Sequence, residues 1–134
     1  MQADRDCKPL DLTGRWQVIH HVAASARLDF IGLDIAFQIR FSQDGQQLAG
    51  EGEKFLVDRM PARPDEVSRL TITGWVQNDD VTISLMEISP RGPERTIIGE
   101  IVWKAIDADQ MLGQFRVDLA DTTGLSEAVR QAAF

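Results

Sequence analysis

Apolar and polar residues alternate along most of this chain with a period of two, the spacing that puts every second side chain on one face of a β-strand. The clearest example is 35–42, where Ile35, Phe37, Ile39 and Phe41 share one face and mostly polar residues share the other. Comparable runs predict strands over about 12–22, 35–42, 47–57, 70–76, 81–86, 95–105 and 111–119. For 125–134 two alternatives stay open: a closing strand, or a short C-terminal helix capped by Ser126.

Short turn motifs separate these runs. Asp44-Gly45 is a strong hairpin signal, and 78–80, 90–93 and 107–109 have similar turn compositions. Seven or eight strands joined by tight turns describe an up-and-down antiparallel meander, which leaves two exposed edges unless it closes. We therefore predict an all-β fold, a single closed up-and-down antiparallel barrel of about eight strands over 11–134, preceded by a polar lead at 1–10.

A glycine follows an apolar residue at a spacing of two in five places: Leu12-x-Gly14, Leu48-x-Gly50, Ile72-x-Gly74, Ile97-x-Gly99 and Met111-x-Gly113. Glycine weakens a strand unless backbones crowd or bend there, as they do in a small barrel. The motif leaves open whether the barrel is hollow or filled.

Composition narrows the classes of partner. The 134 residues have a net charge of −7 and contain no basic stripe of the kind that phosphate binding needs, so we expect no nucleic-acid partner. Cys7 is the single cysteine, so no intrachain disulfide forms, and no apolar run approaches the ~18 residues of a membrane span. The polar start at 1–6 fits a cytoplasmic protein and a secreted protein with its signal removed about equally.

Three segments resemble the lipocalin- and avidin-like small barrels, together called calycins. They are Leu12-Thr13-Gly14-Arg15-Trp16, the hairpin at 41–50, and Gly113-x-Phe115 followed by Gly124-x-Ser126-x-Ala128-x-Arg130. The resemblance is to small barrels of bacterial type, and it implies an arginine, here Arg130, packed over Trp16 to close the barrel. It also implies ligand binding at the mouth, though not of biotin, since the chain has no tyrosine and has Gln17, Val18 and Ile19 after the tryptophan.

The first function expected is therefore non-enzymatic binding of a small, largely apolar ligand at the barrel mouth. The apolar segment 23–33 lies where a lid over such a mouth would be, with a loop that plugs the barrel for stability as the alternative. The expected lining residues are His20, Phe37, Phe41, Ile72, Leu85 and Phe115. We expect no cofactor, and no metal because adjacent His20 and His21 point to opposite faces.

An alternative is an accessory or protein-interaction subunit with a packed interior, including a homo-oligomer. Trp75 and Trp103 are expected off the inward row, where aromatic residues favour an interface, unless the register is shifted by one residue. The expected contact residues are Trp75, Trp103, Leu28, Phe30 and Ile31. A third function, a small isomerase or cyclase, would use His20 with Glu87 or Glu100, both expected to face inward.

Overall fold

The computed structural model describes residues 10–58, 60–61, 67–92 and 96–131. Nearly all of the predicted lead at 1–10 lies outside these residues. The elements in chain order are β1 (Gly14–Ala24), η1 (Leu28–Phe30), β2 (Asp34–Asp44), β3 (Gln47–Val57), β4 (Met60–Pro61), β5 (Arg69–Gln77), β6 (Asp80–Ile88), β7 (Ile97–Asp107), β8 (Gln110–Val117), η3 (Leu119–Asp121) and β9 (Thr122–Arg130).

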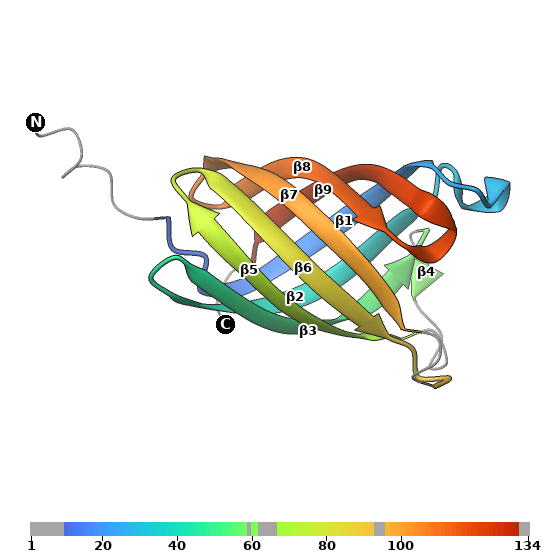
Figure 1. Ribbon diagram of the computed structural model, residues 1–134, viewed down its shortest axis with the longest axis horizontal. Helices are drawn as coiled ribbons and strands as arrows, with labels where there is room; N and C mark the ends of the chain where they lie inside the picture. The colour runs from blue at the N-terminus through green and yellow to red at the C-terminus, as the bar shows by residue number, and fades with distance from the viewer. Residues whose placement is uncertain (1–9, 59, 62–66, 93–95, 132–134) are drawn as a thin grey trace, which may run out of the picture.

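Eight long strands form the closed antiparallel barrel that the alternation predicts (Figure 1). Each strand pairs with its neighbour along the chain, and β1 pairs with both β2 and β9, which closes the wall. The two-residue β4 folds back onto the end of β3. Closure gives every long strand two partners and removes the exposed edges that an open meander would have.

The two ends of the barrel differ. Tight turns join β2 to β3, β5 to β6 and β7 to β8 at one end, on the left in Figure 1, which we call the floor. Gly45 and Asn78 provide the left-handed backbone, at φ 61° and 57°, that two of these turns require. The longer connections, including η1 and β4, gather at the opposite end, which we call the mouth.

The inward side chains of all eight strands meet in one core. On β6, for example, Val81, Ile83, Leu85 and Glu87 are buried, and the residues between them are exposed. The predicted crowding at glycine is present at Gly113, where an added Cβ would overlap the backbone of Val102 on β7. Strand spacing, rather than an empty interior, therefore accounts for this glycine.

The two alternatives for the chain end are resolved in favour of a strand. Leu125 to Arg130 belong to β9, so the C-terminal helix is wrong for these residues, and 132–134 lie outside the described part. Tertiary pairing explains the result, because β9 bonds to both β1 and β8 and satisfies the backbone on either side. Among the residues described, no helix has the length and hydrophobicity to cross a bilayer.

Candidate ligand-binding site

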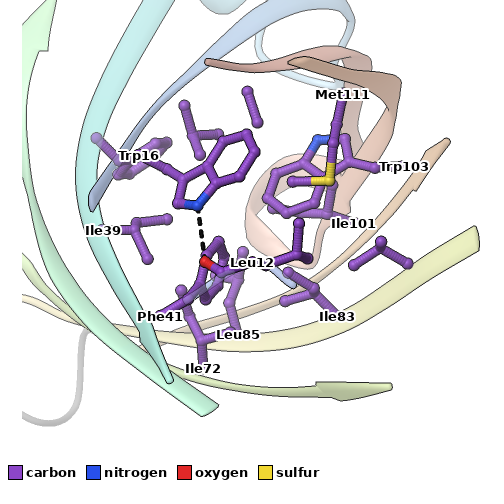
Figure 2. Packing of buried hydrophobic residues seen from close by; sticks show 14 of the residues in the cluster. Leu12, Trp16, Ile39, Phe41, Ile72, Ile83, Leu85, Ile101, Trp103 and Met111 are labelled. Carbon is purple, nitrogen blue, oxygen red and sulfur yellow. Dashed lines mark hydrogen bonds between the residues drawn. The ribbon is translucent and has the colours of Figure 1, made fainter. Parts of the chain in front are cut away.

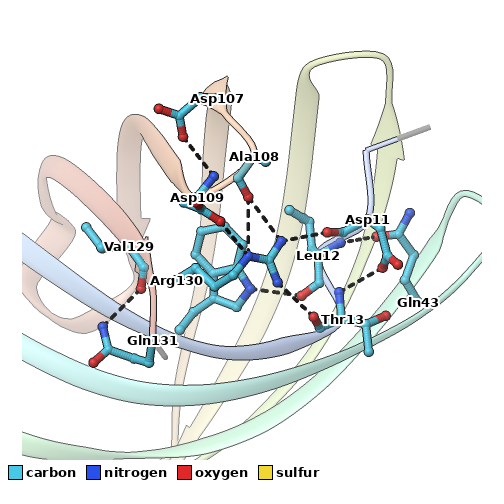
Figure 3. A network of polar contacts seen from close by, with 11 residues as sticks. Asp11, Leu12, Thr13, Gln43, Asp107, Ala108, Asp109, Val129, Arg130 and Gln131 are labelled. Carbon is cyan, nitrogen blue, oxygen red and sulfur yellow. Dashed lines mark hydrogen bonds and ion pairs between the residues drawn. The ribbon is translucent and has the colours of Figure 1, made fainter. Parts of the chain in front are cut away.

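The floor is closed by Arg130. Its guanidinium carbon lies 4.6 Å from the centre of the Trp16 ring, the contact that the calycin resemblance implied. Its nitrogens donate to the carbonyl oxygens of Asp11 (2.7 Å), Thr13 (2.8 Å) and Ala108 (3.0 Å), and Nε pairs with the Asp109 carboxylate at 2.9 Å (Figure 3). One side chain thus ties the N-terminal segment and the β7–β8 turn to the last strand.

Next to the contacts of Arg130, the interior of the barrel is filled by aromatic side chains. Phe41 packs edge-on between Trp16, at 6.5 Å between ring centres, and Trp103, at 6.2 Å (Figure 2). The indole nitrogen of Trp16 donates to the Leu12 carbonyl, and that of Trp103 donates to Ser126 Oγ, both at 2.8 Å. The floor half of the barrel is therefore packed.

The structure divides the six predicted lining residues into two groups. Phe41 belongs to the packed floor half, while Ile72 and Leu85 are opposed on β5 and β6 and join the same core. His20, Phe37 and Phe115 form a second set of ring contacts, here called the aromatic cluster, and its two phenylalanines belong to that core as well. The His20 ring stacks on Phe115, with centres 3.9 Å apart and planes 4° from parallel, and Phe37 meets it edge-on at 5.0 Å.

Glycine makes the stacking possible. Gly124 on β9 pairs with Phe115 on one side and Val22 on the other. A Cβ there would overlap the His21 carbonyl and meet the Phe115 ring at 2.8 Å. Because Gly124 has no Cβ, the ring of Phe115 can lie against His20 on β1.

His20 is buried without a partner for one of its polar atoms. It is 3% exposed, and among the described residues its Nε2 has no hydrogen-bond partner. Burial, with a smaller contribution from His21, lowers the pKa of His20 to about 3, so the ring is neutral at ordinary pH. A neutral imidazole nitrogen can donate or accept one hydrogen bond, depending on the tautomer.

A second polar group lies inside the barrel toward the mouth. Lys54 Nζ donates to Glu87 Oε2 at 3.1 Å, with side chains 18% and 9% exposed. Lys54 is opposite Phe37 in the β2–β3 pairing, beside a bulge, so the ion pair adjoins the aromatic cluster. Sequence reasoning missed Lys54, although its position follows from the period of two in Gly50-x-Gly52-x-Lys54.

The acid–base pairs that an isomerase or cyclase would use are not assembled. Glu87 faces inward as expected, but its carboxylate is engaged by Lys54. Glu100 is exposed, opposite Ser84 and Arg116 on the outer wall, so its expected inward orientation is wrong. It follows Gly99 directly, and adjacent residues of a strand face opposite sides.

The two tryptophans that were expected at an interface differ in burial. Trp75 is 46% exposed on the outer wall, whereas Trp103 is 1% exposed. The outward orientation expected for Trp103 is therefore wrong. Trp103 shares the parity of Gly99 and Ile101, which places it inside, where Ser126 binds its indole nitrogen.

The segment 23–33 lies at the mouth, the position expected of either a lid or a plugging loop. The backbone N–H groups of Ala26 and Gly32 donate to the carbonyls of Ala120 and Val22, at 2.7 and 2.9 Å. Phe30 and Leu33 pack against the core, while Leu28 and Ile31 are exposed. Backbone hydrogen bonds thus hold the segment 23–33 to the barrel, while its exposed apolar side chains lie at the rim.

Both ends of the barrel expose aspartates: Asp44, Asp79, Asp107 and Asp109 at the floor turns, and Asp29, Asp58, Asp118 and Asp121 at the mouth. The mouth also exposes large apolar side chains, among them Leu28, Ile31, Met60, Ile88 and Leu119. These side chains offer apolar contact to a molecule at the rim.

Two grooves on the outer wall lie apart from this cluster. They measure about 680 and 670 Å³ and cross β1, β2 and β3, with Arg15, Arg40 and Glu51 lining both. His20, Phe37 and Phe115 line neither groove. Within the described residues, no group of three or more His, Cys, Asp or Glu is arranged to hold a metal ion.

Comparison with known proteins places the fold. No protein-family model matches the chain, and no curated protein matches it. Solved structures do. The redesigned β-barrel b11L5F_LGL is 14% identical, with a TM-score of 0.61 over 91% of this chain and 92% of its own. The chain shares the barrel fold of this structure.

Two further barrels extend the comparison. The redesigned barrel mFAP1, solved bound to DFHBI, is 16% identical, with a TM-score of 0.61 over 90% of this chain and 94% of its own. EF1p2_mFAP2b, also bound to DFHBI, is 12% identical, with a TM-score of 0.66 over the same shares. At these identities the likeness establishes the fold alone.

Proposed function

We propose that this protein is a non-enzymatic barrel that binds a small, largely apolar ligand in its mouth half, against His20, Phe37 and Phe115. The observation that supports this most is the unpaired, buried Nε2 of His20. A buried polar atom without a partner costs about 1–3 kcal/mol, so a partner from outside the chain would recover that free energy. The aromatic rings around it supply apolar contact area for such a molecule.

The mouth fits the role of an entry. Its rim exposes apolar side chains, and the opposite end is sealed by Arg130. The two solved barrels that hold DFHBI support only the general point that a barrel of this fold accommodates a small molecule.

We also infer that this protein is related to the lipocalin- and avidin-like barrels. The up-and-down order of the strands supports it, as does Arg130 over Trp16 at the closed end. These features belong to the fold and its closure, and neither of them identifies a ligand.

The experiment is a titration with Nile red, a neutral dye whose fluorescence rises in apolar surroundings. Two matched substitutions introduce the same indole on opposite sides of the β1 wall. His20→Trp crowds the proposed site and should abolish the fluorescence rise, whereas His21→Trp should retain it. A second matched pair, Phe37→Trp and Gln38→Trp, repeats the comparison on β2 in case His20→Trp does not fold. No dye binding by the folded wild-type protein would refute the proposal.

The second candidate function, protein interaction, is favoured by one observation on the outer wall. Val102, Leu125 and Leu112 are exposed on adjacent strands, and Gln114 lies opposite both Val102 and Leu125. Sedimentation velocity over a hundredfold concentration range tests the homo-oligomer version. If the protein is a homo-oligomer, it should associate as its concentration rises, and Leu125→Lys should disrupt the association. A monomer at all concentrations would contradict the homo-oligomer.

A further inference from the structure

We propose that the mouth site selects a neutral, flat aromatic ligand whose hydroxyl group hydrogen-bonds to His20 Nε2, in preference to carboxylates. This proposal rests on the function proposed above and specifies its ligand class. The chemistry comes from the shape of the aromatic cluster, the buried ring nitrogen and the ion pair beside it.

The preference for a flat ring follows from the geometry of the cluster. Phe115 lies parallel to His20 at 3.9 Å, and Phe37 presents its ring to the same histidine at an angle of 67°. A further aromatic ring that enters beside these three would make stacked and edge-on contacts of the same kind. A branched aliphatic chain gains only general apolar contact there.

The preference for a hydroxyl follows from the neutral state of His20. Because the ring is buried and uncharged, Nε2 is an acceptor in one tautomer and a donor in the other. A hydroxyl group can pair with either tautomer, because it can both donate and accept a hydrogen bond. A methyl group of similar size would leave Nε2 unpaired.

The exclusion of carboxylates follows from charge. Among the described residues, Lys54 is the cation that faces the interior of this half of the barrel, and Glu87 already pairs with it at 3.1 Å. His21, the next histidine, lies on the outer face between Asp34 and Glu127. A ligand carboxylate would therefore enter a buried region whose positive charge is already compensated, and it would lose hydration without gaining a counter-ion.

Three ligands of nearly equal size test the proposal: 2-naphthol, 2-methylnaphthalene and 2-naphthoate, each displacing Nile red from the full-length protein at pH 7.5. We expect 2-naphthol to bind about tenfold more tightly than 2-methylnaphthalene, the effect of one additional hydrogen bond, and 2-naphthoate to bind most weakly. In His20→Phe the advantage of naphthol over methylnaphthalene should disappear, while in His21→Phe it should remain.

The results separate the ligand class from the binding function. Equal binding of naphthol and methylnaphthalene by the wild-type protein, or tightest binding of naphthoate, overturns the proposed class while leaving the binding function intact. Displacement of Nile red by none of the three overturns it as well. These comparisons use the wild-type protein, so they hold even if His20→Phe does not fold. If Nile red itself does not bind, the proposed function fails first.

Discussion

His20 and His21 are adjacent on β1, yet the barrel wall puts them in opposite electrostatic environments. His20 is buried with Nε2 unpaired. His21 is partly exposed, with Nδ1 2.7 Å from the Asp34 carboxylate and Nε2 3.3 Å from that of Glu127. The period of two in a strand is sufficient to produce this contrast.

His20 should make the protein sensitive to mild acid. The unfolded chain takes up a proton at this residue below pH 6.5, but the folded protein does not until its lowered pKa, about 3. The free energy of unfolding therefore falls with pH through this window, by about 2–3 kcal/mol at pH 4.5. Urea unfolding at pH 7.5 and 4.5 measures the loss, which His20→Phe should reduce. An equal loss in the variant would contradict the buried neutral state.

His21 should act in the opposite direction. Partial burial lowers its pKa, but the hydrogen bonds and charges of Asp34 and Glu127 outweigh that effect and raise it. The stabilisation is thus complete below pH 6.5 and disappears as the pH rises through the raised folded pKa. His21→Gln should cost under about 1 kcal/mol at pH 6, because the pair is exposed, and less at pH 9. Urea unfolding at the two pH values checks this, and a larger loss at pH 9 would reverse the assigned sign.

Arg130 should be one of the most sensitive positions outside the core. Arg130→Ala removes the hydrogen bonds to Asp11, Thr13 and Ala108 and the contact with Trp16, which together predict a loss of about 2–4 kcal/mol. Thermal and urea unfolding provide the measurement. Arg40→Ala, at an exposed arginine of β2, is the matched control and should lie within about 0.5 kcal/mol of wild type. Equal losses of stability at the two arginines would contradict the role of Arg130 in closing the floor.

The Lys54–Glu87 pair should show strong coupling. Lys54→Met leaves a nearly buried carboxylate without its counter-ion, and Glu87→Leu leaves the ammonium unpaired, so each single change should cost about 3 kcal/mol. The double variant should be closer to wild type than the sum of the two. A double-mutant cycle by urea unfolding measures the coupling, and additive losses would show that the two charges do not interact in the folded protein.

Much of the fold follows from local patterns in the sequence. The alternation on β2 and β6 and the Asp44-Gly45 turn are sufficient to place strands and hairpins, and closure follows from the need to pair the edges. Inward or outward orientation is more fragile, since a one-residue change of parity reverses it. Trp103 and Glu100 were misplaced in this way, although counting from Gly99 gives both orientations.

The candidate site is less accessible from sequence. His20 and Phe115 are far apart along the chain, and their stacking depends on β1–β9–β8 pairing and on the space at Gly124. The meeting of Lys54 with Glu87 depends on the β3–β5 and β5–β6 pairings, which no local motif announces. Which side chains meet inside the barrel is set by its three-dimensional register, and the alternation of each strand limits only the candidates.

Nitrogen-15 NMR of histidine-labelled protein tests the central claim most directly, because His20 and His21 are the only histidines in the chain. At pH 5 the account predicts one neutral imidazole, His20, and one charged imidazole, His21. At pH 7.5, saturating 2-naphthol should shift the Nε2 resonance of His20 and leave that of His21 unchanged. A His20 that titrates near pH 6.5, or a His20 Nε2 that does not respond to bound naphthol, would contradict a ligand site built on this residue.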